Sequence, residues 1–90
     1  MTACQVIAEI TRIALGFGAK RLVLFGSRAK GTYLERSDID IAVSGVEDMP
    51  RFRDYVDNIR TLYSVDIVDL DKLKDAALRE DIEEYGRALL

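Results

Sequence analysis

The apolar residues near the start of the chain recur three or four positions apart, which predicts an amphipathic helix. Thr2 can cap the start of this helix, and Gly16 or Gly18 can end it. The apolar positions concerned are Val6, Ile7, Ile10, Ile13 and Ala14.

Three later segments have the composition or the alternation of strands. Residues 21–25 are a short apolar run closed by Gly26, which favours a buried strand. Residues 38–43 alternate polar and apolar side chains, as a strand with two unlike faces does. Residues 64–70 repeat this apolar and acidic mixture, and we expect a third strand there.

The segments between and after these strands have helical features. A helical turn is expected around residues 28–30, before Gly31. Pro50 suits the first position of a helix, and a final helix is expected towards the end of the chain. The two apolar stripes are Phe52, Tyr55, Val56, Ile59, Leu62 and Tyr63 in the first, and Leu78, Ile82, Tyr85 and Leu89 in the second. We therefore expect the α/β (α+β) class, with a small mixed sheet of about three to four strands flanked by helices.

Length and composition limit what this domain can do. Ninety residues predict a single domain over residues 1–90. The net charge of −3 argues against direct nucleic-acid binding. Histidine is absent, which excludes serine–histidine and cysteine–histidine catalysis. A single cysteine, no signal peptide and no membrane-length apolar stretch predict the cytoplasm as the compartment.

Asp38 and Asp40 are the first candidates for chemistry. Side chains two apart in a strand share a face, so both carboxylates should project to one side while Ile39 and Ile41 face the core. Two carboxylates on one face repel each other unless a cation or proton shares the site. Magnesium takes oxygen ligands and can be held by one or two carboxylates plus substrate phosphates. The alternative is a solvent-facing edge strand without any ligand.

The turn after the first strand is the second candidate. Glycine at Gly26 allows the backbone to approach a ligand closely, and backbone N–H groups in such a turn can bind phosphate oxygens. Ser27 adds a hydroxyl donor, and Arg28 and Lys30 add positive charge for a triphosphate. The alternative is a plain strand-to-helix turn with a serine cap.

Strand direction connects these candidates. If Gly26 and Asp38 contact one nucleotide, the second strand must run antiparallel to the first. A helical connection allows the third strand to run parallel to the second, which would bring Asp66 near Asp38 and Asp40. Asp69 would then lie on the opposite face. A register that differs by an odd number of residues would exchange Asp66 for Asp69.

The sequence also resembles a known family. Residues 26–31, Gly-Ser-Arg-Ala-Lys-Gly, precede residues 37–43, Ser-Asp-Ile-Asp-Ile-Ala-Val, and the acidic strand at residues 65–70 follows. This arrangement resembles the signature of the DNA polymerase β-like nucleotidyltransferase superfamily. It is most similar to the MNT-type minimal nucleotidyltransferases that are paired with HEPN proteins, and the resemblance covers essentially the whole chain.

The resemblance implies roles for three aspartates. Asp38 and Asp40 would bind two Mg²⁺ ions, with Mn²⁺ as a possible replacement. Asp66 would complete the catalytic metal site and help to activate the attacking hydroxyl. Gly26 and Ser27 would hold the triphosphate of ATP.

The resemblance also implies an acceptor and a partner. The expected reaction is transfer of a nucleoside monophosphate, AMP from ATP, to a tyrosine of a HEPN toxin, with this chain acting as the antitoxin in a hetero- or homo-oligomer. A small-molecule nucleotidyltransferase subunit of the aminoglycoside type is one alternative. A non-catalytic antitoxin that acts by occlusion is the other.

Overall fold

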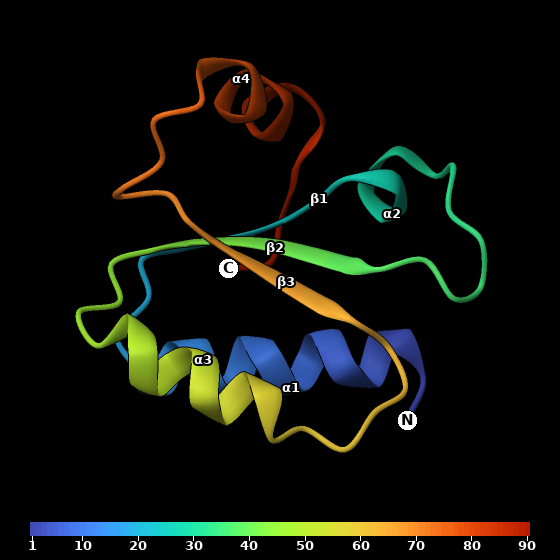
Figure 1. The fold of residues 1–90 in the computed structure, drawn as a ribbon, viewed down its shortest axis with the longest axis horizontal. Helices are drawn as coiled ribbons and strands as arrows, with labels where there is room; N and C mark the ends of the chain where they lie inside the picture. Colours follow the sequence, from blue (N-terminus) through green and yellow to red (C-terminus); the bar gives the residue numbers. More distant parts are fainter.

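The computed structural model describes residues 1–90, and its elements follow the expected order (Figure 1). The helices and strands are α1 (Ala3–Gly16), β1 (Arg21–Phe25), α2 (Ser27–Lys30), β2 (Ile39–Ser44), α3 (Met49–Asp57), β3 (Val65–Asp69), α4 (Ala76–Tyr85) and β4 (Arg87–Ala88). Thr2 caps α1 through a capping box with Gln5, and Asp48 caps α3, so both helix starts have local causes.

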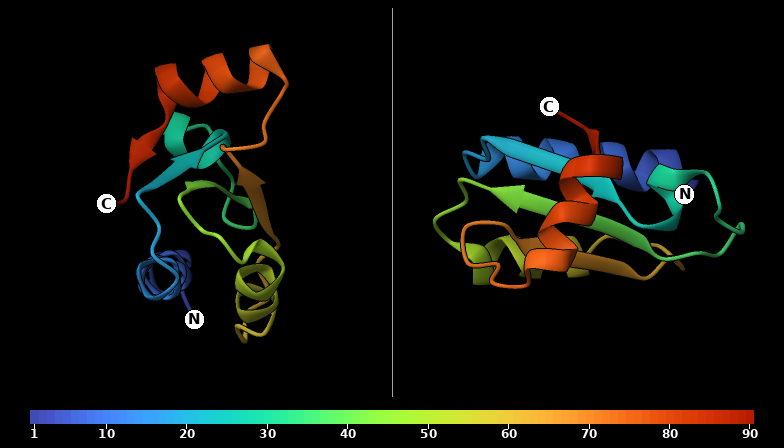
Figure 2. Two further views of the ribbon diagram at one scale, coloured as in Figure 1. Left: turned by 90° about the vertical axis from the view of Figure 1, so that its left-hand side faces the viewer. Right: turned by 90° about the horizontal axis from the view of Figure 1, so that it is seen from above.

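The four strands form one mixed sheet in the order β3-β2-β1-β4. β1 and β2 run antiparallel, whereas β2 and β3 run parallel, as the sequence predicted. Helices α1 and α3 cover one face of the sheet, and α2 and α4 lie on the other (Figures 1 and 2). The predicted fold class is therefore confirmed.

Each face of the sheet packs its own apolar cluster. The larger cluster joins α1 and α3 to the sheet, and Phe52, Ile10 and Ile41 are fully buried in it. The smaller cluster joins α4 to the opposite face through Ile82, Val23 and other residues. No helix of the chain is long and apolar enough to cross a membrane.

The expected length of the middle helix was wrong. α3 ends at Asp57, so Ile59, Leu62 and Tyr63 lie beyond it, and Leu62 is 96% exposed. The last turn tightens at this end: the N–H of Ile59 donates to the carbonyl of Val56, three residues back, at 3.1 Å.

The expected final helix was also too long. α4 ends at Tyr85, and the chain turns at Gly86 into β4, which pairs antiparallel with β1. A Cβ atom at Gly86 would lie 2.3 Å from the carbonyl oxygen of Ile82 and 2.4 Å from a methyl group of Val23. Only glycine permits this close approach, and Leu89 consequently packs beside the larger cluster and does not extend the stripe of α4.

Candidate active site

The pairing of β2 with β3 brings two of the predicted aspartates side by side. Asp40 and Asp66 are register partners in the parallel strands, so their side chains share one face. Asp38 lies immediately before β2 and two residues from Asp40, on the same face. This face carries α2 and α4 (Figure 1).

Gly26 closes the site from the neighbouring strand. Its predecessor Phe25 is the register partner of Asp40 in the antiparallel pair of β1 and β2. Gly26 has φ 74° and ψ −155°, a conformation that strongly favours glycine. A Cβ atom there would lie 2.3 Å from Oδ2 of Asp40, so the missing side chain leaves room for the carboxylate. Ser27 follows directly as the first residue of α2.

The electrostatics of Asp40 reflect this crowding. Its side chain is half-buried, whereas Asp38 and Asp66 are exposed. Burial, followed by the charges of Asp66 and then Asp38, raises the pKa of Asp40 above its usual range. A raised pKa means that the ionised carboxylate is disfavoured here unless positive charge joins it.

The donor set fits a hard cation. The site offers carboxylate oxygens from Asp38, Asp40 and Asp66, with mutual repulsion that a cation would relieve. The carboxylates do not form a complete cage in this structure, because no three acidic side chains lie close enough to hold one ion together. A site of this kind would draw its remaining ligands from water and substrate phosphates, as magnesium sites commonly do.

Arg28 has a different set of partners from the triphosphate that the sequence suggested. Its side chain is buried, and its guanidinium donates to the backbone carbonyls of Ser37 and Glu35 at 2.9–3.1 Å. The guanidinium carbon also lies 4.9 Å from the ring centroid of Tyr33 and 5.1 Å from that of Tyr63. Arg28 therefore holds the loop that leads into Asp38.

Lys30, the other basic residue of α2, is also engaged within the chain. Its ammonium group forms an ion pair with Asp81 of α4 at 2.9 Å and lies 5.0 Å from the ring centroid of Tyr85. These contacts join α2 to α4 above the sheet. Lys30 thus stabilises the position of the turn and, as it stands, does not extend towards a phosphate.

Asp69 lies apart from the other aspartates. It pairs in register with Val43, whose side chain belongs to the larger core cluster on the opposite face. Its carboxylate accepts a hydrogen bond from the backbone N–H of Asp71 at 3.0 Å, in the turn after β3. The structure thus groups Asp66, and not Asp69, with Asp38 and Asp40.

The loop-anchoring contacts of Arg28 were missed in the sequence. Its hydrogen-bond acceptors are backbone carbonyls, which leave no residue-type pattern, and its aromatic neighbours lie 5 and 35 positions away. The available signal was weak: an arginine inside a short helical turn, followed by a polar loop that must return to a fixed aspartate.

The site thus combines a glycine turn with paired aspartates on neighbouring strands of a mixed sheet. Residues 4–89 match the family model of the nucleotidyltransferase domain, and the chain therefore belongs to that family. The expected resemblance to minimal nucleotidyltransferases is confirmed. Comparison with curated proteins gives no significant match.

Three solved structures share the fold. A toxin–antitoxin crystal structure with AMP-PNP has a TM-score of 0.69 at 24% identity, covering 93% of this chain and 72% of that chain. A mutant of the toxin–antitoxin MntA-HpeT has a TM-score of 0.68 at 22% identity, with the same coverage. A protein of Sulfolobus solfataricus assigned as a nucleotidyltransferase has a TM-score of 0.55 at 27% identity, covering 93% of this chain and 76% of that chain.

Proposed function

We propose that this domain transfers AMP from ATP to a hydroxyl group of a partner protein, as the antitoxin of a cytoplasmic toxin–antitoxin pair. The observation that carries the proposal is the meeting of Asp40 and Asp66 in register, next to the open space at Gly26. Membership of the nucleotidyltransferase family supports the reaction class.

In this proposal, each part of the site has a chemical task. The backbone N–H groups at Gly26 and Ser27, with the serine hydroxyl, bind phosphate oxygens. Asp38, Asp40 and Asp66 would hold two divalent cations, Mg²⁺ or Mn²⁺. When bound, these cations supply charge stabilisation for the attacking and leaving oxygens.

The proposed step is an in-line displacement at the α-phosphorus of ATP. The acceptor hydroxyl oxygen forms a bond to this phosphorus while the bond from phosphorus to the bridging oxygen breaks, and pyrophosphate leaves. We assign Asp66, the exposed carboxylate on the outer strand β3, to take the proton of the hydroxyl. Asp40 lies deeper, between β1 and β3.

Similarity to two toxin–antitoxin structures supports a protein acceptor. In the MntA-HpeT mutant, two aspartates separated by one residue are replaced by glutamate, and Asp38 and Asp40 have the same spacing. We propose a toxin of the HEPN family as the partner and one of its tyrosines as the acceptor. A hetero-oligomer of the two proteins follows from this assignment.

The test is incubation of this chain with α-labelled ATP, magnesium and the candidate toxin. We expect label to appear on the toxin, and tyrosine to be the modified residue in peptide mass spectrometry. Label on an aminoglycoside-type small molecule, and none on the toxin, would favour the small-molecule alternative. Neutralisation of the toxin by an Asp38→Asn, Asp40→Asn variant without any label would favour simple occlusion.

A further inference from the structure

The outer edge of β3 is an unpaired sheet edge beside the candidate active site. β3 is the terminal strand of the order β3-β2-β1-β4, and Figure 2 shows no other strand beyond it. Ser64 and Leu70 hydrogen-bond towards β2, the first through its carbonyl and the second through its N–H, both at 2.9 Å. Because this direction alternates along a strand, Val65 and Ile67 present their N–H and C=O groups outwards.

Only one of these outward groups has a side-chain partner. Nη1 of Arg53, from α3, donates to the carbonyl oxygen of Ile67 at 2.9 Å. Both outward groups of Val65 and the N–H of Ile67 remain available to a further strand. Charged side chains often cover sheet edges and so prevent pairing with another strand. Here Arg53 covers only one of the outward groups.

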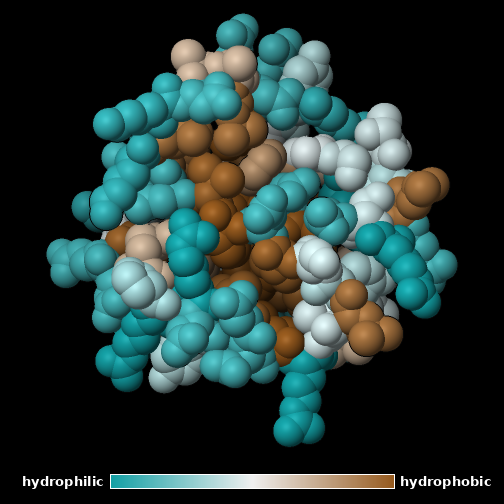
Figure 3. Space-filling view, in the orientation of Figure 1, coloured by the Kyte–Doolittle hydropathy of each residue, from teal (hydrophilic) through white to brown (hydrophobic).

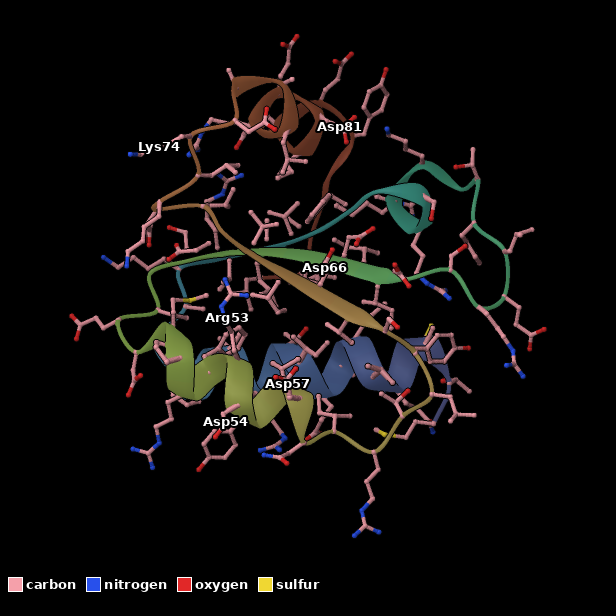
Figure 4. The ribbon with its side chains drawn as sticks, in the orientation of Figure 1. Arg53, Asp54, Asp57, Asp66, Lys74 and Asp81 are labelled. Atoms are coloured by element: carbon pink, nitrogen blue, oxygen red, sulfur yellow. The ribbon has the colours of Figure 1, made fainter.

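One acidic residue of α3, Asp57, lies beside this edge, whereas Arg53 contacts the edge at Ile67. Asp57 lies one helical turn after Arg53 and lines a pocket of about 290 Å³ together with Ser64 and Val65. No ion pair engages Asp57. Figure 4 shows Arg53, Asp54 and Asp57 on α3 next to β3, with Asp66 on the strand itself.

Apolar surface accompanies the acidic groups. Val65, Ile67 and Val68 of β3 are only partly buried against the two clusters. In Figure 3, apolar side chains reach the surface in the middle of this face and are framed by hydrophilic ones. An extended peptide that paired with β3 would cover this surface.

We propose that the partner presents its acceptor hydroxyl on an extended segment that adds to the sheet at the open edge of β3. This inference rests on the proposed function and specifies how the acceptor reaches the same site. A strand added at this edge lies about 4.8 Å from β3. Its residue next to Asp66 points to the same face as Asp66, which places a hydroxyl side chain beside the carboxylate that accepts its proton.

The edge also specifies the residues that flank the acceptor. Neighbours of the acceptor residue point to the other face, towards α3 and the pocket at Asp57. At the neighbour beside Val65, charge complementarity with Asp57 calls for lysine or arginine, with its aliphatic stem against Val65. The neighbour beside Ile67 meets Arg53 and is not basic. The occupant is thus an extended segment in which a tyrosine, serine or threonine adjoins one basic residue that lies beside Val65 and Asp57. A second copy of this chain fits poorly, because symmetric pairing of the two β3 edges would set Asp66 against Asp66 of the other copy.

The test uses a short blocked peptide in which a tyrosine adjoins one arginine, and a matched peptide N-methylated at alternate amides. Binding to the full chain is measured by calorimetry without ATP, and amide exchange is followed by NMR. We expect the first peptide to slow exchange at Val65 and Ile67, and the N-methylated peptide to bind at least about tenfold more weakly because it cannot pair. Equal binding of both peptides, or binding that leaves these two amides unprotected, would overturn the proposal, as would no binding of either.

A pair of charge variants tests the pocket. Asp57→Asn should weaken binding of the arginine–tyrosine peptide about threefold, the range of a solvent-exposed ion pair. Glu80→Gln removes the same charge from the exposed face of α4 and should leave binding unchanged. Equal losses in both variants would indicate non-specific attraction. Self-association of the chain through β3, seen by sedimentation together with protection of Val65 before peptide is added, would assign the edge to a second copy.

These experiments separate the two proposals. Labelled ATP and toxin without transfer would contradict the proposed function, whatever the peptide does. Transfer to the toxin together with unprotected amides at Val65 and Ile67 would retain the function and contradict the docking mode.

Discussion

The two ends of the strand pair β2 and β3 carry aspartates with opposite environments. At one end, burial and the neighbouring charges raise the pKa of Asp40, and no hydrogen bond within the chain lowers it. At the other end, Asp71 accepts from the backbone N–H of Gly45 at 2.9 Å and from the hydroxyl of Ser44 at 2.7 Å. These hydrogen bonds, that of Gly45 first, lower the pKa of Asp71.

The difference distinguishes a structural carboxylate from one suited to bind a ligand. Asp71 joins the end of β2 to the turn after β3, and its charge is stabilised by the fold itself. The charge of Asp40 is opposed by the fold, since Asp66 is its neighbour in register and burial removes water. Asp40 and Asp71 are the same residue type. They differ in the number and direction of the hydrogen-bond donors around them.

The largest expected effect is a difference in transfer rate between variants of Asp66 and Asp69, the two aspartates of β3. Asp66→Ala should lower the rate of transfer by about a hundred- to ten-thousandfold, the range for loss of a general base. Asp69→Ala removes the same group from the opposite face and should leave the rate nearly unchanged. Steady-state transfer with labelled ATP and the protein acceptor measures both. An inactive Asp69→Ala and an active Asp66→Ala would reverse the assignment.

A second prediction concerns the glycine turn, and Gly31 provides a matched control. Gly31 is in the left-handed αL region, where alanine should cost about 1–2 kcal/mol of stability. Gly26 lies in a region open almost only to glycine, where alanine should cost about 1–3 kcal/mol. Only at Gly26 does the new Cβ meet the carboxylate of Asp40; at Gly31 nothing lies within 4 Å. Gly26→Ala should therefore also lower transfer by about a hundredfold, the effect of displacing a catalytic group by about 1 Å.

The same denaturation and transfer measurements apply to both glycine variants. Comparable activity of Gly26→Ala and Gly31→Ala would show that transfer does not depend on the close approach between Gly26 and the carboxylate of Asp40.

A third prediction concerns the loop that carries Asp38. Arg28→Met removes the donors to the carbonyls of Ser37 and Glu35 and should cost about 1–3 kcal/mol of stability, as expected when buried acceptors lose their partners. Hydrogen exchange should quicken in residues 31–37. Urea denaturation and exchange measurements test this, and an unchanged loop in Arg28→Met would contradict the anchoring role.

Replacement of Asp40 should raise the stability of the metal-free protein, whereas most substitutions lower it. Asp40→Asn should raise Tm at neutral pH by about 2–4 °C, the shift for roughly half a kcal/mol in a domain of this size. Because its pKa is raised on folding, ionised Asp40 opposes folding above that pKa. This penalty shrinks as pH falls through the raised pKa and is absent below the unfolded value of 3.8. The gain from Asp40→Asn should disappear in the same acid range.

Asp71 should show the smaller and opposite change. Its pKa is lowered on folding, so ionised Asp71 stabilises the folded state above the unfolded value of 3.8, and this contribution is lost as pH falls through the folded pKa. Asp71→Ala should lower Tm at neutral pH and lower it less in strong acid, where the protonated carboxyl keeps its hydrogen bonds but not its charge. Thermal scans at several pH values, in EDTA, compare the two aspartates directly. If both substitutions changed Tm in the same direction, the proposed difference between the two ends of the β2–β3 strand pair would be contradicted.

Local patterns predicted most of the fold. β1 occupies residues 21–25 as expected, and Thr2 begins the capping box of α1. The antiparallel direction followed from requiring the glycine turn and the aspartates to meet, and the parallel direction from the helical connection; both are found. These predictions succeeded because capping, alternation and short connections act within a few residues.

The remaining features depend on contacts between distant residues. The apolar stripe continued to Leu62, but α3 ends at Asp57 and leaves Leu62 exposed. β4 forms because Gly86 fits against Val23 of β1, a contact that no local pattern reveals. For the site, spacing placed Asp66 with Asp38 and Asp40, whereas the carbonyl partners of Arg28 required the folded loop.

The central claim is that the end of the sheet at Asp40 is a metal-dependent nucleotide site, and calorimetry of ATP binding tests it most directly. ATP is titrated into the chain in magnesium and again in EDTA, with Asp40→Asn and Asp71→Asn as matched variants. We predict binding in magnesium that is lost in EDTA, lost in Asp40→Asn and retained in Asp71→Asn. Equal affinity with and without magnesium, or unaltered binding by Asp40→Asn, would contradict the account.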